Sequence, residues 1–142
     1  MLLRHGTNLD ARDTYDRVPL HCAARAGRAV MVTWLLSHGA DPQACNHEGK
    51  PSFLMAATQG KVEVIKAFLD QGLSPDQLHQ IRGHSALHEA VYGGYLEAVR
   101  FLLENGANPN LRDVEGVSCL KLARRFGNPE MIRLLEGFGA KP

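Results

Sequence analysis

The chain has 142 residues, the size of one compact unit, and its charged fraction of 22% argues against disorder. Lys and Arg number 16 against 15 Asp and Glu, and this balance gives no electrostatic reason to expect nucleic acid or an anionic membrane as partner. No apolar run approaches the ~20 residues that span a bilayer, and the N-terminus lacks the apolar segment of a secretory signal.

Glycine recurs along the whole chain in three series whose steps are 33 or 34 residues. The first series is Gly6, Gly39, Gly72, Gly106 and Gly139. The second is Gly27, Gly60, Gly94 and Gly127, and the third is Gly49, Gly83 and Gly116. Together they hold 12 of the 14 glycines. A fixed period in this range indicates a small supersecondary unit stacked on copies of itself.

The first full unit shows which elements each copy contains. Residues 19–26 are predicted to form a short helix, with Pro19 in its first turn, where a missing N–H costs nothing. Gly27 ends this helix by supplying a left-handed conformation. A more apolar helix over residues 29–36 follows and ends at Gly39 in the same way. The next residues have room for an extended segment and a tight turn only.

The same pair of helices is predicted three more times. The expected spans are residues 53–59 and 62–69, 87–93 and 96–103, and 120–126 and 129–136. One pair of this length is marginal alone in water, so stacking must bury the apolar stripes in a continuous core. The sequence therefore predicts an all-α solenoid of four helix-turn-helix repeats joined by β-hairpin-like loops.

Four strings in these helices resemble the Thr-Pro-Leu-His-x-Ala signature of ankyrin repeats, a family with a 33-residue period. They are Val-Pro-Leu-His-Cys-Ala from Val18, Pro-Ser-Phe-Leu-Met-Ala from Pro51, Ser-Ala-Leu-His-Glu-Ala from Ser85 and Ser-Cys-Leu-Lys-Leu-Ala from Ser118. Residues 38–42 and 105–110 resemble the string that ends a repeat in this family. The resemblance covers essentially the whole chain and implies a single ankyrin-repeat domain over residues 1–142.

The resemblance also sets the expected repeat boundaries. Residues 2–6 match residues 35–39, so we expect a partial repeat at about residues 1–12. The full repeats are then expected at about residues 13–45, 46–79, 80–112 and 113–142. Terminal repeats of a free-standing array normally carry polar outer faces, and the partial repeat is too short to provide one. We therefore expect the chain to be an excerpt from a longer array or a larger protein.

Several positions depart from the family pattern. Asp16 replaces the turn glycine of the first full repeat. Leu54 and Lys121 replace the motif histidine, so the hydrogen bonds of that histidine should be missing in the second and fourth repeats. His21 and His88 keep the motif, and we interpret them as structural residues that bond to neighbouring backbone.

No pattern in the sequence indicates catalysis, a cofactor or a metal. His88 and Glu89 begin like a zinc-protease helix, but Tyr92 stands where the second histidine is required. His21 and Cys22 are adjacent, point about 100° apart on a helix, and so cannot form a nucleophile–base pair. A phosphate-binding Gly-x-x-x-x-Gly-Lys-Ser/Thr string is lacking. The sequence therefore predicts neither an enzyme nor a binder of a small-molecule substrate.

Three other groups have a structural interpretation. Trp34 has apolar neighbours at helical spacing and is predicted to lie in the core. A basic cluster near the C-terminus is expected to be a solvated face with some repeat-to-repeat ion pairing: Arg124, Arg125 and Arg133. The cysteines are few and odd in number: Cys22, Cys45 and Cys119. Such thiols suit a reducing compartment and usually pack as small hydrophobes, so we expect a cytoplasmic and/or nuclear protein.

Solenoid curvature creates a concave surface, and the resemblance implies that hairpin tips and the exposed side of the first helices hold partners. The tip positions are Thr14, Tyr15, Arg17, His47, Glu48, Lys50, Ile81, Arg82, His84, Val114, Glu115 and Val117. The first-helix positions are Arg25, Ala26, Thr58, Gln59, Tyr92, Gly93, Arg125 and Phe126. These positions vary among the four repeats, whereas the glycine, alanine and leucine framework does not. They are therefore either free to fit a partner or simply unconstrained surface.

The predicted function is a non-catalytic protein–protein interaction module that docks a protein or an extended peptide as a rigid monomeric surface. Tyr and Arg, which are frequent at the variable positions, are enriched in interface hot spots. The alternative is a regulatory ankyrin domain that holds a catalytic or channel domain of the same polypeptide in cis.

Overall fold

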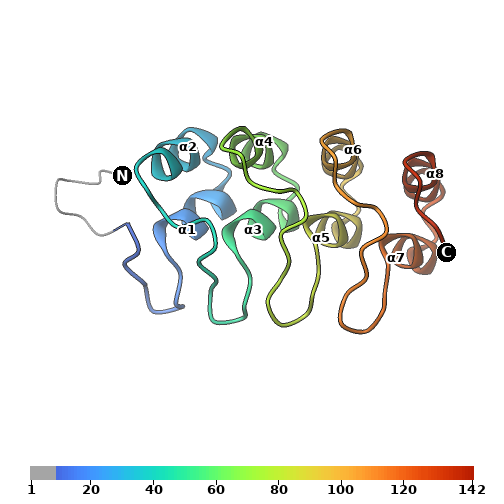
Figure 1. Cartoon of the computed structure of the whole chain (residues 1–142), viewed down its shortest axis with the longest axis horizontal. Helices are drawn as coiled ribbons and strands as arrows, with labels where there is room; N and C mark the ends of the chain where they lie inside the picture. The colour runs from blue at the N-terminus through green and yellow to red at the C-terminus, as the bar shows by residue number, and fades with distance from the viewer. Residues whose placement is uncertain (1–8) are drawn as a thin grey trace.

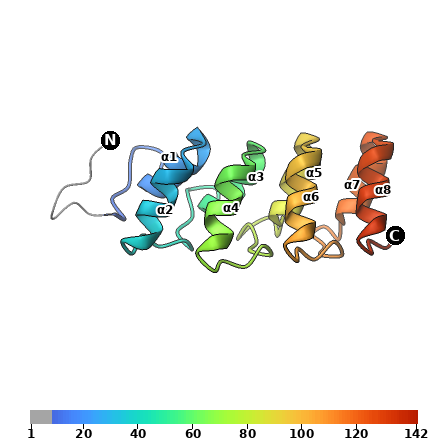
Figure 2. The same ribbon diagram turned by 90° about the horizontal axis from the view of Figure 1, so that it is seen from above.

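The computed structural model describes residues 9–142 and arranges their helices in two rows (Figure 1). The inner row consists of α1 (Pro19–Ala26), α3 (Ser52–Thr58), α5 (Ala86–Gly93) and α7 (Cys119–Phe126). The outer row consists of α2 (Ala29–Ser37), α4 (Val62–Asp70), α6 (Leu96–Glu104) and α8 (Pro129–Gly137). Seen from above, the outer helices lie side by side over the inner ones (Figure 2). The predicted all-α solenoid of four helix pairs is confirmed, while most of the predicted partial repeat lies outside the described residues.

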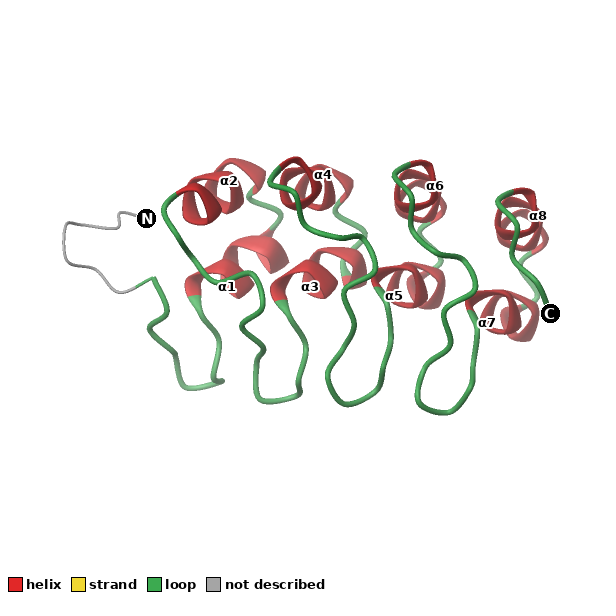
Figure 3. Cartoon of the chain, in the orientation of Figure 1, coloured by secondary structure: helices red, strands yellow, loops and turns green. Residues whose placement is uncertain are grey.

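Hairpin-like loops connect one repeat to the next and project beyond the inner row (Figure 3). Within residues 9–142 no extended strand is present, and isolated antiparallel bridges close three loops instead. The bridges are Cys45 to Pro51, Leu78 to Ser85 and Arg112 to Ser118. The first loop is closed by the Asp13 N–H, which donates to the Arg17 carbonyl at 2.9 Å.

One side chain at the same position of every hairpin organises its turn. In the last hairpin, Asp113 Oδ1 accepts the backbone N–H groups of Glu115 and Val117, both at 2.9 Å. Asp13 and Asn46 accept the equivalent N–H groups in the first two hairpins, and His79 Nδ1 accepts those of Ile81 and Arg82 in the third. Neighbouring hairpins also bond to each other, since the Val114 N–H donates to the Arg82 carbonyl at 3.1 Å. The tips therefore form a continuous row along the stack.

Local residue choices explain where the helices end. Gly94 follows α5 with φ 73°, and its N–H donates to the carbonyls of Ala90 and Val91. Such a left-handed cap is strained for any residue with a Cβ atom, which is why glycine recurs there. Asp16 has φ 60° and is the only non-glycine residue with positive φ in the described part of the chain. It therefore adopts the turn conformation that glycine provides in the other hairpins.

The core runs unbroken between the two rows. Alanines on the inner helices, such as Ala56 and Ala57, are fully buried and allow neighbouring repeats to approach closely. Phe53 of α3 and Phe68 of α4 meet edge to face, with ring centroids 5.5 Å apart. Each helix pair contributes leucine, valine or alanine to this single cluster. No pair could bury its apolar surface alone, so the repeats depend on one another for stability.

The motif histidines link consecutive repeats, as predicted. His88 is fully buried, its Nδ1 accepts the Ser85 N–H at 3.2 Å, and its Nε2 donates to the Val117 carbonyl at 2.8 Å. His21 makes the same two bonds, to Val18 and Lys50. Burial is the largest influence on both histidines and lowers the pKa of each. Bonds to backbone carbonyls oppose this shift, and near His88 the Asp113 and Glu89 carboxylates oppose it too, but the pKa stays below its ordinary value, so both are neutral imidazoles with fixed tautomers.

The second repeat shows why a histidine is dispensable there. Leu54 is fully buried at this position, and the residue three places before it is Pro51, which has no N–H that needs an acceptor. The apolar side chain therefore leaves no donor unsatisfied. Lys121, at the same position of the last repeat, is exposed. The prediction that the histidine bonds are missing from these two repeats is confirmed.

Two predictions about buried residues were wrong. Trp34 is 38% exposed and stacks on His38 with ring centroids 3.8 Å apart. Only Val32 and Leu35 of α2 are buried, and Trp34 points away from them because a single residue step turns a helix by about 100°. Since α2 is apolar on every side, its sequence carried no signal for which face is inward. Of the cysteines, only Cys119 is buried, whereas Cys22 is exposed.

Candidate binding groove

The candidate site is the groove between the hairpins and the exposed side of the inner helices. A polar network crosses its centre. Lys50 of the second hairpin donates from Nζ to Thr58 Oγ1 of α3 at 3.0 Å and lies 3.4 Å from Glu89 Oε2 of α5. The Thr58 hydroxyl is 2.7 Å from the Leu54 carbonyl oxygen and 3.0 Å from Glu89 Oε2, either of which can accept its proton. Consecutive repeats are thus joined across the groove floor.

His84 extends this network into the last hairpin. Its Nδ1 lies 3.4 Å from Glu89 Oε1, and its Nε2 lies 3.3 Å from Asp113 Oδ2. The imidazole ring also stacks on that of His88, with centroids 5.6 Å apart and planes tilted by 13°. His84 therefore stands between two carboxylates that belong to different repeats.

Asp113 is the innermost acid of the network, since its side chain is only 5% exposed. Burial opposes its ionisation, but the pKa is nevertheless lowered, because the N–H groups of Val117 and Glu115 donate to the carboxylate and His84 lies beside it. The Asp113 carboxylate thus stabilises the turn by accepting backbone N–H groups and also contacts the His84 imidazole of the preceding hairpin.

An aromatic pair follows the network toward the C-terminus. Tyr92 of α5 and Phe126 of α7 meet edge to face, with ring centroids 5.4 Å apart. They are 58% and 51% exposed, which is high for two large rings in contact. Tyr92 lines two hollows of the surface, and Phe126 lines the second of them. One is lined by Lys50, Thr58, Arg82, His84, Glu89, Tyr92 and Gly93, and the other by Val91, Tyr92, Gly93, Gly94, Ala123, Phe126, Asn128 and Met131.

The N-terminal end of the groove is more polar. Arg17 pairs with Asp13 at 2.8 Å, and its guanidinium carbon lies 4.9 Å from the ring centre of Tyr15. The bond from Arg17 lowers the pKa of Asp13. His47 Nδ1 lies 3.1 Å from the Tyr15 carbonyl oxygen, which connects the first two hairpins. Arg25, at the end of α1, is exposed and has no ion-pair partner among residues 9–142.

The structure divides the predicted site residues into two groups. The polar network and the aromatic pair bring together Lys50, Thr58, His84, Tyr92 and Phe126. Outside the network, the aromatic pair and the N-terminal contacts described above, the remaining predicted residues are exposed at hairpin tips or helix ends: Thr14, Glu48, Gln59, Ile81, Arg82, Val114, Glu115 and Arg125. Val117 belongs to the framework, because its carbonyl accepts from His88.

Sequence reasoning missed Glu89 and Asp113, which hold the network together. A signal for Glu89 was present, since the equivalent residues of the other repeats are Cys22, Met55 and Leu122. An acid at a position that is otherwise apolar or weakly polar indicates a specific partner. Asp113 gave no such signal, because Asp13 and Asn46 occupy its position in other hairpins, where their side chains accept backbone N–H groups of the turn.

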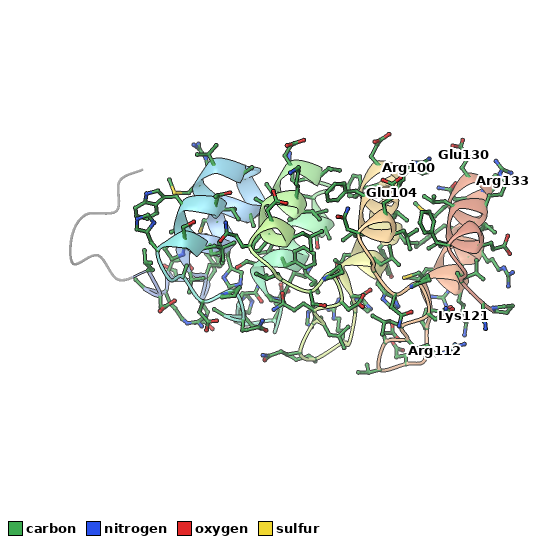
Figure 4. All side chains as sticks on the ribbon, turned by 45° about the horizontal axis from the view of Figure 1, so that its top comes forward. Arg100, Glu104, Arg112, Lys121, Glu130 and Arg133 are labelled. Atoms are coloured by element: carbon green, nitrogen blue, oxygen red, sulfur yellow. The ribbon has the colours of Figure 1, made fainter. Side chains whose placement is uncertain are left out.

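The basic cluster does not form one surface. Arg124 pairs with Glu136 at 3.3 Å, and this pair joins α7 to α8 within one repeat rather than two different repeats. Arg133 lies on the outer row with Arg100 and Glu130, far from Lys121 at the hairpin side (Figure 4). Part of the expected solvated face is therefore on the side of the molecule opposite to the groove.

Two further properties bear on function. Among the residues that the structure describes, no three histidine, cysteine or acidic side chains are grouped so that they could hold a metal ion. Across residues 9–142, each helix is too short or too polar to traverse a bilayer.

Comparisons with known proteins agree with the architecture. A family model described as "Ankyrin repeats (3 copies)" matches residues 53–142, and one described as "Ankyrin repeat" matches residues 15–47. The chain is 51% identical over 41 residues to an ankyrin repeat protein of fowlpox virus (strain NVSL), a match to 29% of this chain and 6% of that protein. It is 44% identical over 54 residues to the 2-5A-dependent ribonuclease of Mus musculus, a match to 37% of this chain and 7% of that protein.

The matched segments are thus a small part of either relative, and they concern the repeats rather than a whole protein. Ankyrin repeats serve generally as protein-interaction modules. The period, the motif strings, the two rows of helices with projecting hairpins and the two family matches lead to one assignment: the chain belongs to the ankyrin repeat family.

Proposed function

We propose that the domain binds a protein or peptide in the groove, by docking on a rigid surface and without catalysis. The observation that carries this proposal is the exposed pair of Tyr92 and Phe126. Folding does not require aromatic residues there, since Arg25, Thr58 and Arg125 stand at the position of Tyr92 in the other repeats. Exposed rings that the core does not use are typical of interface hot spots.

Along the groove and its hairpins, the last two repeats expose Ile81, Tyr92, Val114 and Phe126, against Tyr15 and Leu78 in the first two, which favours the last two repeats as the anchoring region. At the hairpin tips, Ile81 is 64% exposed and Val114 is 71% exposed, whereas the equivalent tip residues of the first two repeats are Thr14 and His47. A partner that covers these tips and the aromatic pair would contact both walls of the groove. We infer that its apolar anchors lie there and its polar contacts nearer the N-terminus.

The polar network supports binding by keeping the groove floor in one conformation. Lys50, Glu89 and His84 come from different elements and are mostly buried beneath the surface that a partner would touch. Side chains already ordered in the free protein lose less entropy when a partner binds. The network is therefore assigned a positioning role, and the aromatic pair the contact role.

The test is an affinity capture with the wild-type domain and with the double variant Tyr92→Ala/Phe126→Ala, each compared by mass spectrometry. Trp34→Ala is the matched control, since it removes an exposed ring from the outer row. The double variant should lose the captured partners, because hot-spot truncations weaken binding by about 2 kcal/mol or more, roughly 30-fold. Equal capture by all three proteins would contradict the proposal, and so would unfolding of the double variant in circular dichroism.

We further propose that the domain works as a monomer in a reducing compartment, the cytoplasm or the nucleus. All three cysteines are free thiols, and only Cys119 is buried. The cis-regulatory alternative is favoured by one observation, the likeness to part of a protein named as a ribonuclease. In that case the aromatic pair would bind another domain of the same polypeptide. The isolated domain should then bind the separately expressed flanking domain, and Tyr92→Ala/Phe126→Ala should abolish that binding.

A further inference from the structure

The groove holds two hollows that meet at Tyr92 and Gly93. The polar hollow has a volume of about 310 Å³ and the apolar hollow about 190 Å³. Gly93 stands where the other repeats carry Ala26, Gln59 and Phe126, and a Cβ atom there would collide with the Tyr95 ring, so the position must stay without a side chain while that ring packs against it. The apolar hollow is walled by carbon-rich side chains, among them Val91, Ala123 and Met131. It fits a single large apolar side chain that packs beside the two aromatic rings.

Two exposed arginines, both positively charged, belong to the elements that line the two hollows. Arg82 lines the polar hollow and is exposed, and Arg125, which is equivalent to Tyr92 in its repeat, is exposed beside Phe126. Neither guanidinium has an ion-pair partner within residues 9–142. The carboxylate of the groove floor, Glu89, is already engaged by Lys50, Thr58 and His84.

Two carboxylates that have no ion-pair partner in the described part of the chain lie at the rim instead of the floor. Glu48 and Glu115 are exposed at the tips of the second and fourth hairpins. They disfavour an acidic chain that crosses the tips, and they favour one that runs along the inner helices past Arg82 and Arg125. Charge at an interface acts mainly on partner choice and orientation, so this arrangement selects a route as well as a composition.

We propose that the groove recognises an extended acidic segment of a partner protein. One large apolar side chain of that segment occupies the hollow that Tyr92 and Phe126 line, and carboxylates on either side of it pair with Arg82 and Arg125. This inference rests on the proposed function, because it names the partner chemistry of the same groove.

A display library of random short peptides tests this composition directly. The library is selected on the wild-type domain, and sequences that also bind Tyr92→Ala/Phe126→Ala are discarded. The enriched peptides should share one large apolar residue flanked by Asp or Glu. A synthetic peptide of the enriched sequence, labelled with a fluorophore, then serves in anisotropy titrations.

Charge reversal shows which cations act. Arg82→Glu and Arg125→Glu should each raise the Kd by about fivefold, as expected for solvent-exposed pairs, and added salt should raise the wild-type Kd. Arg133→Glu reverses a charge on the outer row and should leave the Kd unchanged. Glu115→Gln should leave it unchanged or lower it.

Each contrary outcome has a definite meaning. Enrichment of basic or uncharged peptides that still need Tyr92 and Phe126 would overturn the acidic composition and leave the proposed function standing. Displacement of the peptide by a labelled oligonucleotide, lost in Arg82→Glu, would assign the cations to nucleic acid and overturn the inference. Failure to enrich any peptide that depends on the aromatic pair would contradict the inference and the proposed function together.

Discussion

Replacing His88 by leucine should destabilise the domain, although leucine is native at the equivalent position of the second repeat. In the wild-type protein His88 Nδ1 accepts the Ser85 N–H at 3.2 Å, and Nε2 donates to the Val117 carbonyl at 2.8 Å. Both groups lie at the junction of the third and fourth repeats. The substitution therefore tests whether buried hydrogen bonds couple these repeats.

The expected loss of unfolding free energy depends on which hydrogen bonds the two partners of His88 keep in the variant. The Val117 carbonyl retains the Asp113 N–H at 3.0 Å, so only the net value of one bond is lost there, about 1 kcal/mol. The Ser85 N–H is left buried without its acceptor, which costs about 1–3 kcal/mol. The larger apolar surface of leucine offsets about 1 kcal/mol. We expect His88→Leu to lower the free energy of unfolding by about 2 kcal/mol at neutral pH.

The sign of the pH dependence is also determined. Burial lowers the pKa of His88 below its ordinary value of 6.5, so the folded state holds a neutral imidazole where the unfolded chain binds a proton. The stability that comes from neutral His88 is present above pH 6.5 and is lost as the pH falls through the folded-state pKa. His88→Leu cannot bind this proton, so its deficit should shrink at acidic pH.

Urea unfolding followed by circular dichroism at pH 7 and near pH 5 measures both effects. A second variant, Ser85→Pro/His88→Leu, copies the arrangement of Pro51 and Leu54 and removes the orphaned N–H. It also removes the Ser85 hydroxyl that accepts the N–H of residue 88 at 3.2 Å, a cap worth about 1 kcal/mol, so it should be about as stable as the single variant. A loss below about 0.5 kcal/mol for His88→Leu, or a deficit equal at both pH values, would refute the reasoning, because surface substitutions reach only that size.

Two matched pairs give the remaining predictions. Gly83→Ala and Gly116→Ala both place alanine at positive φ, 70° and 78°, which costs about 1 kcal/mol. Only at Gly83 would the new Cβ also lie 3.1 Å from the Val114 backbone nitrogen. Thermal denaturation should therefore show a larger loss for Gly83→Ala, and equal losses would mean that the hairpins do not pack as described. Burial raises the pKa of the Cys119 thiol to about 12, so this thiol is protonated and shielded in the folded protein. Cys22 is exposed. Iodoacetamide should therefore alkylate Cys22 in the native protein and Cys119 only in urea. Native-state labelling of Cys119 at the rate of Cys22 would show that this part of the core opens.

The sequence by itself determined the elements and their order. The helix predicted over residues 87–93 is observed as Ala86–Gly93, and the one predicted over residues 96–103 as Leu96–Glu104. This was possible because a helix end is a local event. A left-handed cap needs glycine, as at Gly94, whatever the rest of the fold does. The role of His88 as a residue that bonds to backbone was also predictable, since the family motif has a histidine at this position, as His21 shows in the first full repeat.

Only the tertiary structure decided which faces and which charges meet. Trp34 was placed on the wrong face because a helix that is apolar on all sides shows no preferred direction. Glu89 meets Lys50 from 39 positions away in the chain and His84 from five, and only stacking makes these three groups neighbours. Local rules depend on the adjacent residues, whereas contacts between repeats depend on the distance and rotation from one repeat to the next, which no single segment specifies.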